Sequence, residues 1–242
     1  MKLFEDWKEN ESIKFIKDHE PPEGYMGCFS GGKDSCVIKH LVERSNVNVT
    51  WYYSLMPDPP QLIKFIRMFH KNVIFLRPKF SFWEGVVEFF PPHRKARWCC
   101  NYIKEQPSKK INLIHRILGI RAEESSNRAK LGRINQYTKK RINYHPIYFW
   151  TECDVWEYID RYKIPVCELY DLGLSRIGCV VCPWRCGNKE QDIYKKLFPK
   201  YFKLFEKKVT QWWNEKGQFR DRGEKESAKS AEEFIKNWYD GK

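Results

Sequence analysis

Six consecutive residues have the clearest chemical meaning, the segment Ser-Gly-Gly-Lys-Asp-Ser at 30–35. They follow a short apolar run at 25–29 and precede apolar residues spaced as on a helix, a strand–turn–helix context. Two glycines let the backbone approach an anion closely, and a helix N-terminus offers N–H donors and a positive dipole end. Ser30, Lys33 and Ser35 add hydroxyl and ammonium donors. The segment therefore predicts a phosphate-binding loop, with an ordinary connection as the structural alternative. Its glycine spacing differs from that of GxxxxGK[ST].

Two close pairs of cysteines form the second candidate site. Cys99 and Cys100 are adjacent, and Cys179 and Cys182 form a CxxC pair. No secretory signal opens the chain, so we expect a reducing compartment in which clustered thiols bind metal rather than form disulfides. The spacing departs from that of paired CxxC zinc sites, and four thiolates also hold a [4Fe–4S] cluster; zinc remains the alternative. Buried free cysteine fits three others, which lie in apolar periodic segments: Cys28, Cys36 and Cys153.

Strands and helices alternate in the region that must position these residues. Apolar patterning predicts four strands, at 25–30, 47–54, 73–77 and 116–121. It predicts helices at 34–44, 60–70 and 151–162, and an N-terminal helix that ends before Pro21. Thr151 is expected to be the N-cap of the helix at 151–162, with Asp154 at the third position of that helix. The alternation predicts an α/β fold with a parallel sheet and right-handed crossovers.

The remaining segments carry weaker patterns. Residues 80–98 are rich in proline and aromatic residues, which predicts a loop with a helical turn. Residues 127–141 are hydrophilic and are expected to form a mobile arm near the site. Beyond Pro183 the pattern is helical, broken at Pro199 and loosened around 217–229, with a short terminal helix at 230–239.

These features together resemble the phosphoadenosine/adenosine phosphosulfate reductase family, a branch of the PP-loop adenine nucleotide alpha-hydrolase superfamily. The resemblance runs from about residue 24 to 186 and rests on the loop, both cysteine pairs and three further matches: Gly119–Ser125 with Arg128, Tyr144–Trp156, and Arg176–Pro183. It implies a Rossmann-like PP-loop domain whose nucleotide lies above the carboxyl edge of the sheet. In iron–sulfur members a vicinal pair and a distant CxxC hold a [4Fe–4S] cluster, which implies that role for Cys99, Cys100, Cys179 and Cys182.

The chain departs from the reductases of this family in two ways. They carry a catalytic cysteine in an ECGLH-like tail, whereas this chain has no cysteine after Cys186. They also tend to have a degraded loop, whereas this loop is intact. Both departures favour relatives that cut ATP between its alpha and beta phosphates, such as tRNA thiolation enzymes and the ATP-using subunit of DNA phosphorothioation systems. Cys186 is the candidate local substitute for the tail cysteine, with Arg185 expected to lower its pKa; an inert or cluster-adjacent thiol is the alternative.

The resemblance and the residue types give roles around the nucleotide. Lys33 is expected to neutralise the leaving pyrophosphate, and Asp34 to hold Mg²⁺. Arg121, which ends a predicted strand, is expected to clamp a phosphate or an acidic group, as are Arg128 and Arg176. Glu123 and Glu124 could equally cap a helix. The expected catalytic residues are Lys33, Asp34, Arg121 and Cys186. The expected nucleotide contacts are Ser30, Gly31, Gly32, Lys33, Asp34, Ser35, Gly119, Arg121, Arg128 and Arg176.

The net charge indicates the kind of partner, and the chain length limits the number of domains. The 242 residues carry a formal charge of +13, which favours anionic partners, among them tRNA or DNA. Aromatic residues within the basic stretch 195–208 could stack bases, although at helical spacing they more often form core. We also expect a sulfur or electron donor protein and a homodimer as partners, no membrane association, and a cytoplasmic location. The expected parts are an N-terminal helix (1–22), the PP-loop domain with its Fe–S site (23–186) and a helical C-terminal extension (187–242).

Three functions are consistent with these features. The first is an ATP pyrophosphatase-type enzyme, releasing AMP and pyrophosphate, that activates a substrate for sulfur transfer. The second is a sulfonucleotide reductase that releases sulfite from adenosine or phosphoadenosine phosphosulfate (APS or PAPS). The third is a non-catalytic, nucleotide-sensing iron–sulfur subunit. The intact loop and the absent tail cysteine favour the first, and the overall family resemblance favours the second.

Overall fold

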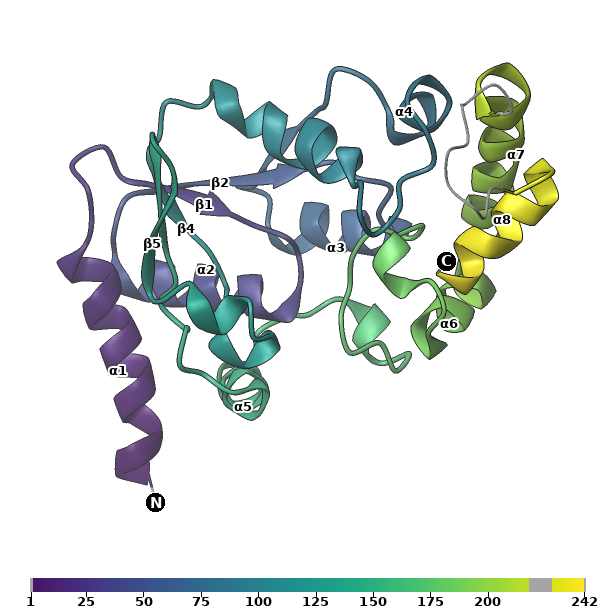
Figure 1. Cartoon of the computed structure of the whole chain (residues 1–242). Helices are drawn as coiled ribbons and strands as arrows, with labels where there is room; N and C mark the ends of the chain where they lie inside the picture. The colour runs from purple at the N-terminus through teal and green to yellow at the C-terminus, as the bar shows by residue number, and fades with distance from the viewer. Residues whose placement is uncertain (1, 218–227, 242) are drawn as a thin grey trace. The chain divides into compact units, whose positions relative to one another are not determined.

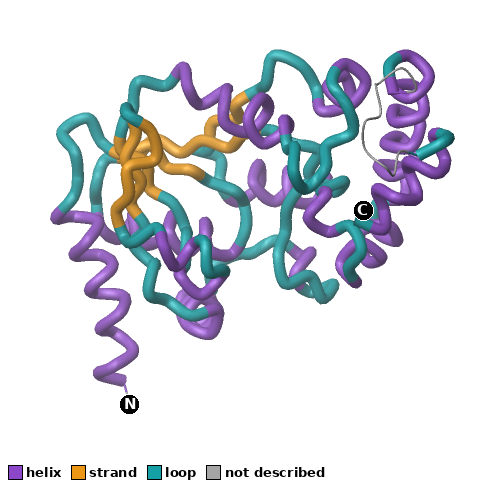
Figure 2. Tube along the Cα trace, viewed as in Figure 1, coloured by secondary structure: helices purple, strands orange, loops and turns teal. Residues whose placement is uncertain are grey.

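The computed structural model describes residues 2–217 and 228–241, with side chains from residue 7 on. By its contacts the chain separates into two compact units made of interleaved segments (Figures 1 and 2). Unit 1 comprises Met1–Tyr53, Pro60–Phe75 and Ile111–Ile177, and unit 2 comprises Ser54–Pro59, Leu76–Lys110 and Gly178–Lys242. Local sequence patterns did not predict that the segments of the two units alternate along the chain. The domain boundaries predicted after residues 22 and 186 stay a prediction.

Unit 1 is built on a six-stranded sheet with the order β3-β2-β1-β4-β6-β5. Its strands are β1 (Tyr25–Cys28), β2 (Val49–Ser54), β3 (Ile74–Leu76), β4 (His115–Ile117), β5 (Ile134–Thr138) and β6 (Arg141–Tyr144). β1 pairs in parallel with β2 and with β4, and β4 pairs in parallel with β6. The edge strand β5 runs antiparallel to β6. The predicted α/β class with a mostly parallel sheet is therefore confirmed.

Four longer helices accompany this sheet: α1 (Lys2–Asp18), α2 (Lys33–Ser45), α3 (Pro60–Phe69) and α5 (Glu152–Tyr162). α2 packs against both α1 and α5, and Figure 1 shows α2 and α3 on the same side of β1 and β2. Val37, Ile38 and Leu41 bury the inner face of α2 almost completely. α5 begins as predicted, because Thr151 accepts from the Asp154 amide while the Asp154 carboxylate accepts from the Thr151 amide.

Two sequence expectations for unit 1 are wrong. The strand predicted at 116–121 ends at Ile117, so Arg121 lies beyond the strand rather than at its end. The stretch 127–141, expected to be a mobile arm, contains β5 and the start of β6. β6 escaped prediction because it buries polar residues instead of an apolar run: Arg141 is 9% exposed and Asn143 is 5% exposed.

Unit 2 is mainly helical, with α4 (Phe82–Glu88), α6 (Lys189–Leu197), α7 (Pro199–Glu215) and α8 (Ala231–Asp240). α4, α6 and α8 each pack against α7. α4 is the helical turn expected within the loop at 80–98, and it is a longer, capped helix, because Ser81 and Glu84 form a capping box that stabilises it. The break at Pro199 and the terminal helix are confirmed, and most of the loosened stretch 217–229 lies outside the described residues.

Aromatic side chains form the core of unit 2. Tyr194 and Phe205 are fully buried, and Phe198 and Phe202 are each 5% exposed. Phe205 also contacts Trp238 of α8, with 4.4 Å between ring centroids. Phe198, Phe202 and Phe205 of the basic stretch 195–208 therefore pack inward, as the helical spacing favoured, and these three rings are not available to stack bases, whereas Tyr201 is half-buried.

A buried histidine gives unit 1 a testable pH dependence. His70 follows α3, packs between Phe29 and Phe65, and is 7% exposed. Burial, aided by Lys39, lowers the pKa of His70 to about 4. The folded chain therefore prefers neutral His70, so this contribution is complete above the ordinary pKa near 6.5 and is lost as pH falls toward 4.

We expect His70 to account for a loss of about 2 kcal/mol of unfolding free energy between pH 7.5 and 5.0. Urea unfolding of a His70→Gln variant should lack this component, whereas a variant at the exposed His93, His93→Gln, should keep it. Equal pH dependence in the wild type and His70→Gln would contradict the assignment.

Within the part of the chain that the structure describes, no helix is both long and apolar enough to cross a bilayer.

Candidate functional site

The predicted phosphate loop connects β1 to α2 in unit 1, at the carboxyl end of the strand. Gly31 has φ +73°, in the left-handed region, and a Cβ there would lie 2.7 Å from Leu62 Cδ1. Gly32 is the N-cap of α2 and has no side chain of its own to cap the helix. A Cβ on Gly32 would meet only Ser30 Oγ and Tyr170 Oη, each at 3.4 Å. Gly31 is thus needed for the fold of the loop, whereas Gly32 keeps space open in front of the helix N-terminus.

Hydroxyl groups hold the loop in shape. Ser30 Oγ donates to Ser35 Oγ at 3.1 Å and accepts from the Gly32 amide at 3.3 Å. Ser35 Oγ lies 2.8 Å from the Gly32 carbonyl oxygen, to which it donates. The Lys33 amide donates to the hydroxyl of Tyr170 at 2.9 Å. Tyr170 was missed by sequence reasoning, because it lies 137 residues from Lys33 in a short 3-10 turn, and no local pattern marks it.

Lys33 points into unit 1. It is 4% exposed, and its Nζ donates to the Ser175 carbonyl at 3.1 Å and pairs with Glu152 at 3.1 Å. The ammonium also lies 5.9 Å and 5.5 Å from the ring centroids of Trp156 and Tyr170. In this arrangement Lys33 ties α2 to the segment 152–175, and its predicted contact with a leaving pyrophosphate stays a prediction.

Buried Arg121 pairs with half-buried Asp34 beside the loop. Arg121 is 3% exposed, and its Nε donates to Asp34 Oδ1 at 2.6 Å. Its NH1 group donates to Glu123 at 2.6 Å, and its backbone amide donates to Glu124 at 3.2 Å. A Cβ on Gly119 would lie 2.8 Å from the Asp34 carbonyl oxygen, so a glycine is needed for this close approach. Asp34 thus positions Arg121, a role that competes with its predicted role in holding Mg²⁺.

The three predicted clamp arginines influence one another. Burial lowers the pKa of Arg128 to about 10, and repulsion from Arg176 and Arg121 adds to this effect while Asp34 opposes it. Arg128 also pairs with Glu124. Mutually repelling guanidinium groups gain stability when an anion lies among them. Arg121 thus pairs with Asp34 of the loop, and Arg121 and Arg176 both lie within electrostatic range of Arg128, while the clamp role of the three arginines stays a prediction.

The paired cysteines come together in unit 2. Cys99 precedes, and Cys100 begins, a π-helical turn, Cys100–Glu105. A hydrogen bond to Cys100 and burial raise the pKa of Cys99, and the charges of Cys179 and Cys182 raise it further. The hydrogen bond from Cys99 lowers the pKa of Cys100 to about 6, with Arg97 and Lys104 adding to the effect. The four predicted ligands therefore lie within electrostatic range of one another.

These thiols are not arranged around a single ion. Among the residues that the structure describes, no group of three or more His, Cys, Asp or Glu side chains is placed to hold one metal ion. In a [4Fe–4S] cluster each thiolate binds a different iron, so its ligands stand farther apart than those sharing one ion. A set of four thiols with Arg97 and Lys104 nearby suits such an anionic cluster in its donor chemistry.

The other cysteines differ in part from expectation. Burial raises the pKa of Cys186 to about 12, so the expected lowering by Arg185 is wrong. Arg185 is directed elsewhere, to the Cys179 carbonyl and to the Tyr194 hydroxyl. Cys36 is buried as expected, Cys28 is half-buried, and Cys153 is exposed. The Cys153 expectation is wrong because that residue lies on the outward face of α5.

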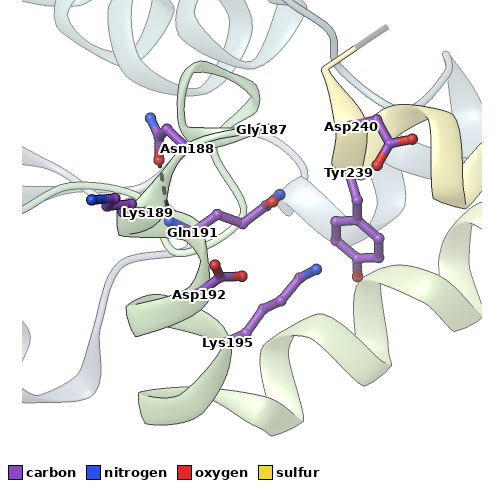
Figure 3. A pocket seen from close by; sticks show the side chains of 8 residues that line it. All are labelled: Gly187, Asn188, Lys189, Gln191, Asp192, Lys195, Tyr239 and Asp240. Carbon is purple, nitrogen blue, oxygen red and sulfur yellow. Dashed lines mark hydrogen bonds between the residues drawn. The ribbon is translucent and has the colours of Figure 1, made fainter.

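A hollow of about 600 Å³ opens within unit 2, between the start of α6 and the end of α8 (Figure 3). Its lining is polar and carries both signs of charge: Gly187, Asn188, Lys189, Gln191, Asp192, Lys195, Tyr239 and Asp240. The Tyr239 ring is covered by Lys195, whose Nζ lies 3.6 Å from the ring centroid. A face of this ring is thus already occupied, which makes the hollow a poor site for stacking an adenine base.

A phosphate-type loop at the carboxyl edge of a mostly parallel sheet defines a PP-loop type of nucleotide-binding fold. The family model described as the phosphoadenosine phosphosulfate reductase domain matches residues 25–185. The chain belongs to this family.

Relatives and solved structures agree with that assignment. The chain is 33% identical over 238 residues to the uncharacterized protein MJ0066 of Methanocaldococcus jannaschii, covering 88% of this chain and 49% of that protein. It is 26% identical over 218 residues to the adenosine 5'-phosphosulfate reductase of Bacillus mycoides, and the match covers 78% of this chain and 91% of that enzyme. The phosphoadenylyl-sulfate reductase of Candida auris shares the fold, with a TM-score of 0.57 and 18% sequence identity. The match covers 70% of this chain and 88% of that structure. The chain spans about half the length of the first curated relatives it matches.

Proposed function

We propose that this chain binds ATP on the loop 30–35, cleaves it to AMP and pyrophosphate, and couples that step to sulfur transfer. The observation that carries the proposal is the N-terminus of α2, where the N-cap residue Gly32 has no side chain, with Arg121 paired to Asp34 beside it and with Arg128 and Arg176 within electrostatic range of one another. Amide donors and several guanidinium groups suit a polyphosphate with more than one charged group.

The proposed reaction has two balanced steps. An oxygen of the acceptor attacks the alpha phosphorus of ATP, the bond to the bridging oxygen breaks, and pyrophosphate leaves. A hydrosulfide-type donor then attacks the activated carbon, forming a carbon–sulfur bond as AMP departs with the acceptor oxygen. The donor is supplied by a sulfur-carrying partner protein, and nucleic acid is the proposed acceptor.

Residues of unit 1 have defined parts in the first step. Gly32 leaves room for a phosphate to approach the α2 amides, and Arg121, Arg128 and Arg176 stabilise the charge that develops on pyrophosphate. Mg²⁺ is proposed as the companion of ATP, with Asp34 as its protein ligand when the ion pair to Arg121 rearranges.

The four thiols of unit 2 are proposed to hold a [4Fe–4S] cluster. When bound, such a cluster supplies either a site for a sulfur atom or electrons. We expect anaerobically prepared protein to contain one cluster per chain, detected by Mössbauer spectroscopy and by iron and sulfide analysis. Cys100→Ser and Cys182→Ser should lose most of the iron, whereas Cys153→Ser, at an exposed cysteine, should retain it. Stoichiometric zinc without iron or sulfide would rule out the cluster.

Sulfonucleotide reduction is the second candidate, favoured by the 26% identity to an adenosine 5'-phosphosulfate reductase along 91% of that enzyme. It requires a thiolate that attacks the sulfur of the sulfonucleotide and releases AMP or its 3'-phosphorylated form; Cys186 is the proposed candidate, although burial raises its pKa. A non-catalytic nucleotide-sensing role is the third candidate.

One experiment separates these functions. Reconstituted protein is incubated anaerobically with ATP, with adenosine phosphosulfate and with phosphoadenosine phosphosulfate, in the presence of hydrosulfide, a dithiol reductant and nucleic acid as the acceptor. AMP with pyrophosphate from ATP supports the first function, and sulfite release supports the second. Ser35→Ala should reduce either activity, whereas Ser45→Ala, at the other end of α2, serves as the matched control. Binding without turnover under all three conditions would leave the sensing role.

A further inference from the structure

An exposed tryptophan stands next to the paired cysteines of unit 2. Trp184 lies in the 3-10 turn Pro183–Arg185, two residues after Cys182, and is 54% exposed. The guanidinium carbon of Arg97 lies 5.0 Å from its ring centroid. NH1 of Arg97 also reaches the sulfur of Cys100, at 4.0 Å. The ring therefore presents an aromatic surface, partly covered by a cation, beside two of the four thiols.

The turn that carries Trp184 is held from several sides. Arg94 donates to the carbonyl oxygens of Pro183 and Cys186. Arg185, which is 8% exposed, donates to the Cys179 carbonyl. The side-chain amide of Asn188 donates to the Trp184 carbonyl at 3.4 Å. A backbone fixed in this way holds an exposed ring in place, so little conformational freedom is lost when a ligand stacks on it.

We propose that Trp184 and Arg97 form a platform on which an unpaired base of an RNA stacks. Aromatic and guanidinium planes are the surfaces that stack on bases that have left a helix. Arg94, Lys95 and Arg97 are all exposed and supply charge complementary to the neighbouring phosphates.

The chemistry of the platform selects among nucleic acids. A single exposed ring cannot reach the faces of bases inside a duplex, because those faces are already covered by stacking. RNA presents unpaired bases in its loops and bulges, whereas cellular DNA is mostly paired. A loop of structured RNA is therefore the occupant. This inference deepens the proposed function by naming the acceptor class, but RNA binding itself does not depend on ATP cleavage.

The test measures RNA binding by fluorescence anisotropy, with reconstituted protein and no ATP. Three labelled probes are compared: an RNA stem–loop, a fully paired RNA duplex of equal length and the DNA version of the stem–loop. We expect both stem–loops to bind more tightly than the duplex, and Trp184→Ala to weaken binding of the RNA stem–loop about 5- to 100-fold, the range typical of losing one stacked base. Trp184→Phe should stay within about threefold of the wild type, since an aromatic face remains.

The matched control is Trp7→Ala, which removes another exposed tryptophan, 62% exposed, from α1 of unit 1. It should leave RNA affinity unchanged, and cluster absorbance should persist in every variant. Unchanged affinity in Trp184→Ala, or duplex RNA bound as tightly as the stem–loop, would overturn the platform. Binding of the DNA stem–loop at a similar affinity would support the platform, because its selection rests on unpaired bases. RNA binding is measured without ATP, and ATP cleavage is assayed separately with saturating RNA as the acceptor, so failure of the proposed reaction and failure of the platform are distinguishable.

Discussion

Replacing Gly32 with valine should lower the affinity for ATP at least about thirtyfold, close to 2 kcal/mol, and leave the fold intact. A Cβ at this position meets its nearest neighbours at an ordinary contact distance of 3.4 Å, and the backbone there has φ −78°, which valine can adopt. The added methyl groups instead occupy the space in front of the α2 amides, where a phosphate must approach. Isothermal titration calorimetry with ATP measures the loss, and thermal unfolding verifies the fold.

The adjacent glycine provides the contrast. Gly31→Val should destabilise the chain by about 3 kcal/mol or more, because φ +73° disfavours a side chain and a Cβ would lie 2.7 Å from Leu62. The two variants place the same side chain at neighbouring positions, yet one is expected to lose ligand and the other to lose fold. Wild-type ATP affinity in a folded Gly32→Val protein would show that the loop is only a structural connection.

Replacing Arg121 with methionine should cost about 2–3 kcal/mol of unfolding free energy, because it leaves the Asp34 carboxylate, 19% exposed, without its closest cation and with the Lys33 ammonium 3.9 Å away. Arg121 is 3% exposed and lies 2.6 Å from the carboxylate. Nucleotide binding should be lost as well, since a guanidinium is removed beside the phosphate loop. Urea unfolding and calorimetry give the two quantities.

A double variant separates structure from binding. Asp34→Asn together with Arg121→Met removes both charges and should recover much of the stability, but it should not recover nucleotide binding. Lys14→Met, which breaks the exposed pair with Asp18, is the control and should cost less than about 1 kcal/mol. Full recovery of binding in the double variant would show that Arg121 serves only to neutralise Asp34.

Strong local patterns predicted much of unit 1. The strand before the loop, α2, α3 and the capped start of α5 follow from apolar spacing and from Thr151 with Asp154, within a few residues of the observed bounds. Predictions were wrong where burial involved polar side chains, as in β6, and fell short where a short capped helix lay among prolines and aromatics, as in α4. In both places tertiary contacts outweigh the local pattern.

The candidate site divides in the same way. The loop glycines, the clamp arginines and the paired cysteines could be named from residue type, because each carries chemistry in its own side chain or backbone. The residues that contact these site residues, and so fix their position and charge environment, could not be predicted from the sequence. Tyr170 on the Lys33 amide, Glu152 on the Lys33 ammonium and Asp34 on Arg121 all come from segments distant in sequence.

The family, the parallel α/β class and the residue types available for phosphate and metal chemistry follow from the amino-acid sequence, because these depend on short-range order along the chain. Three features depend on the folded chain: Lys33 is buried against Ser175, burial raises the pKa of Cys186, and Trp184 is exposed on a turn held by hydrogen bonds. Burial and charge proximity arise from contacts between distant segments. They therefore appear only once the chain is folded.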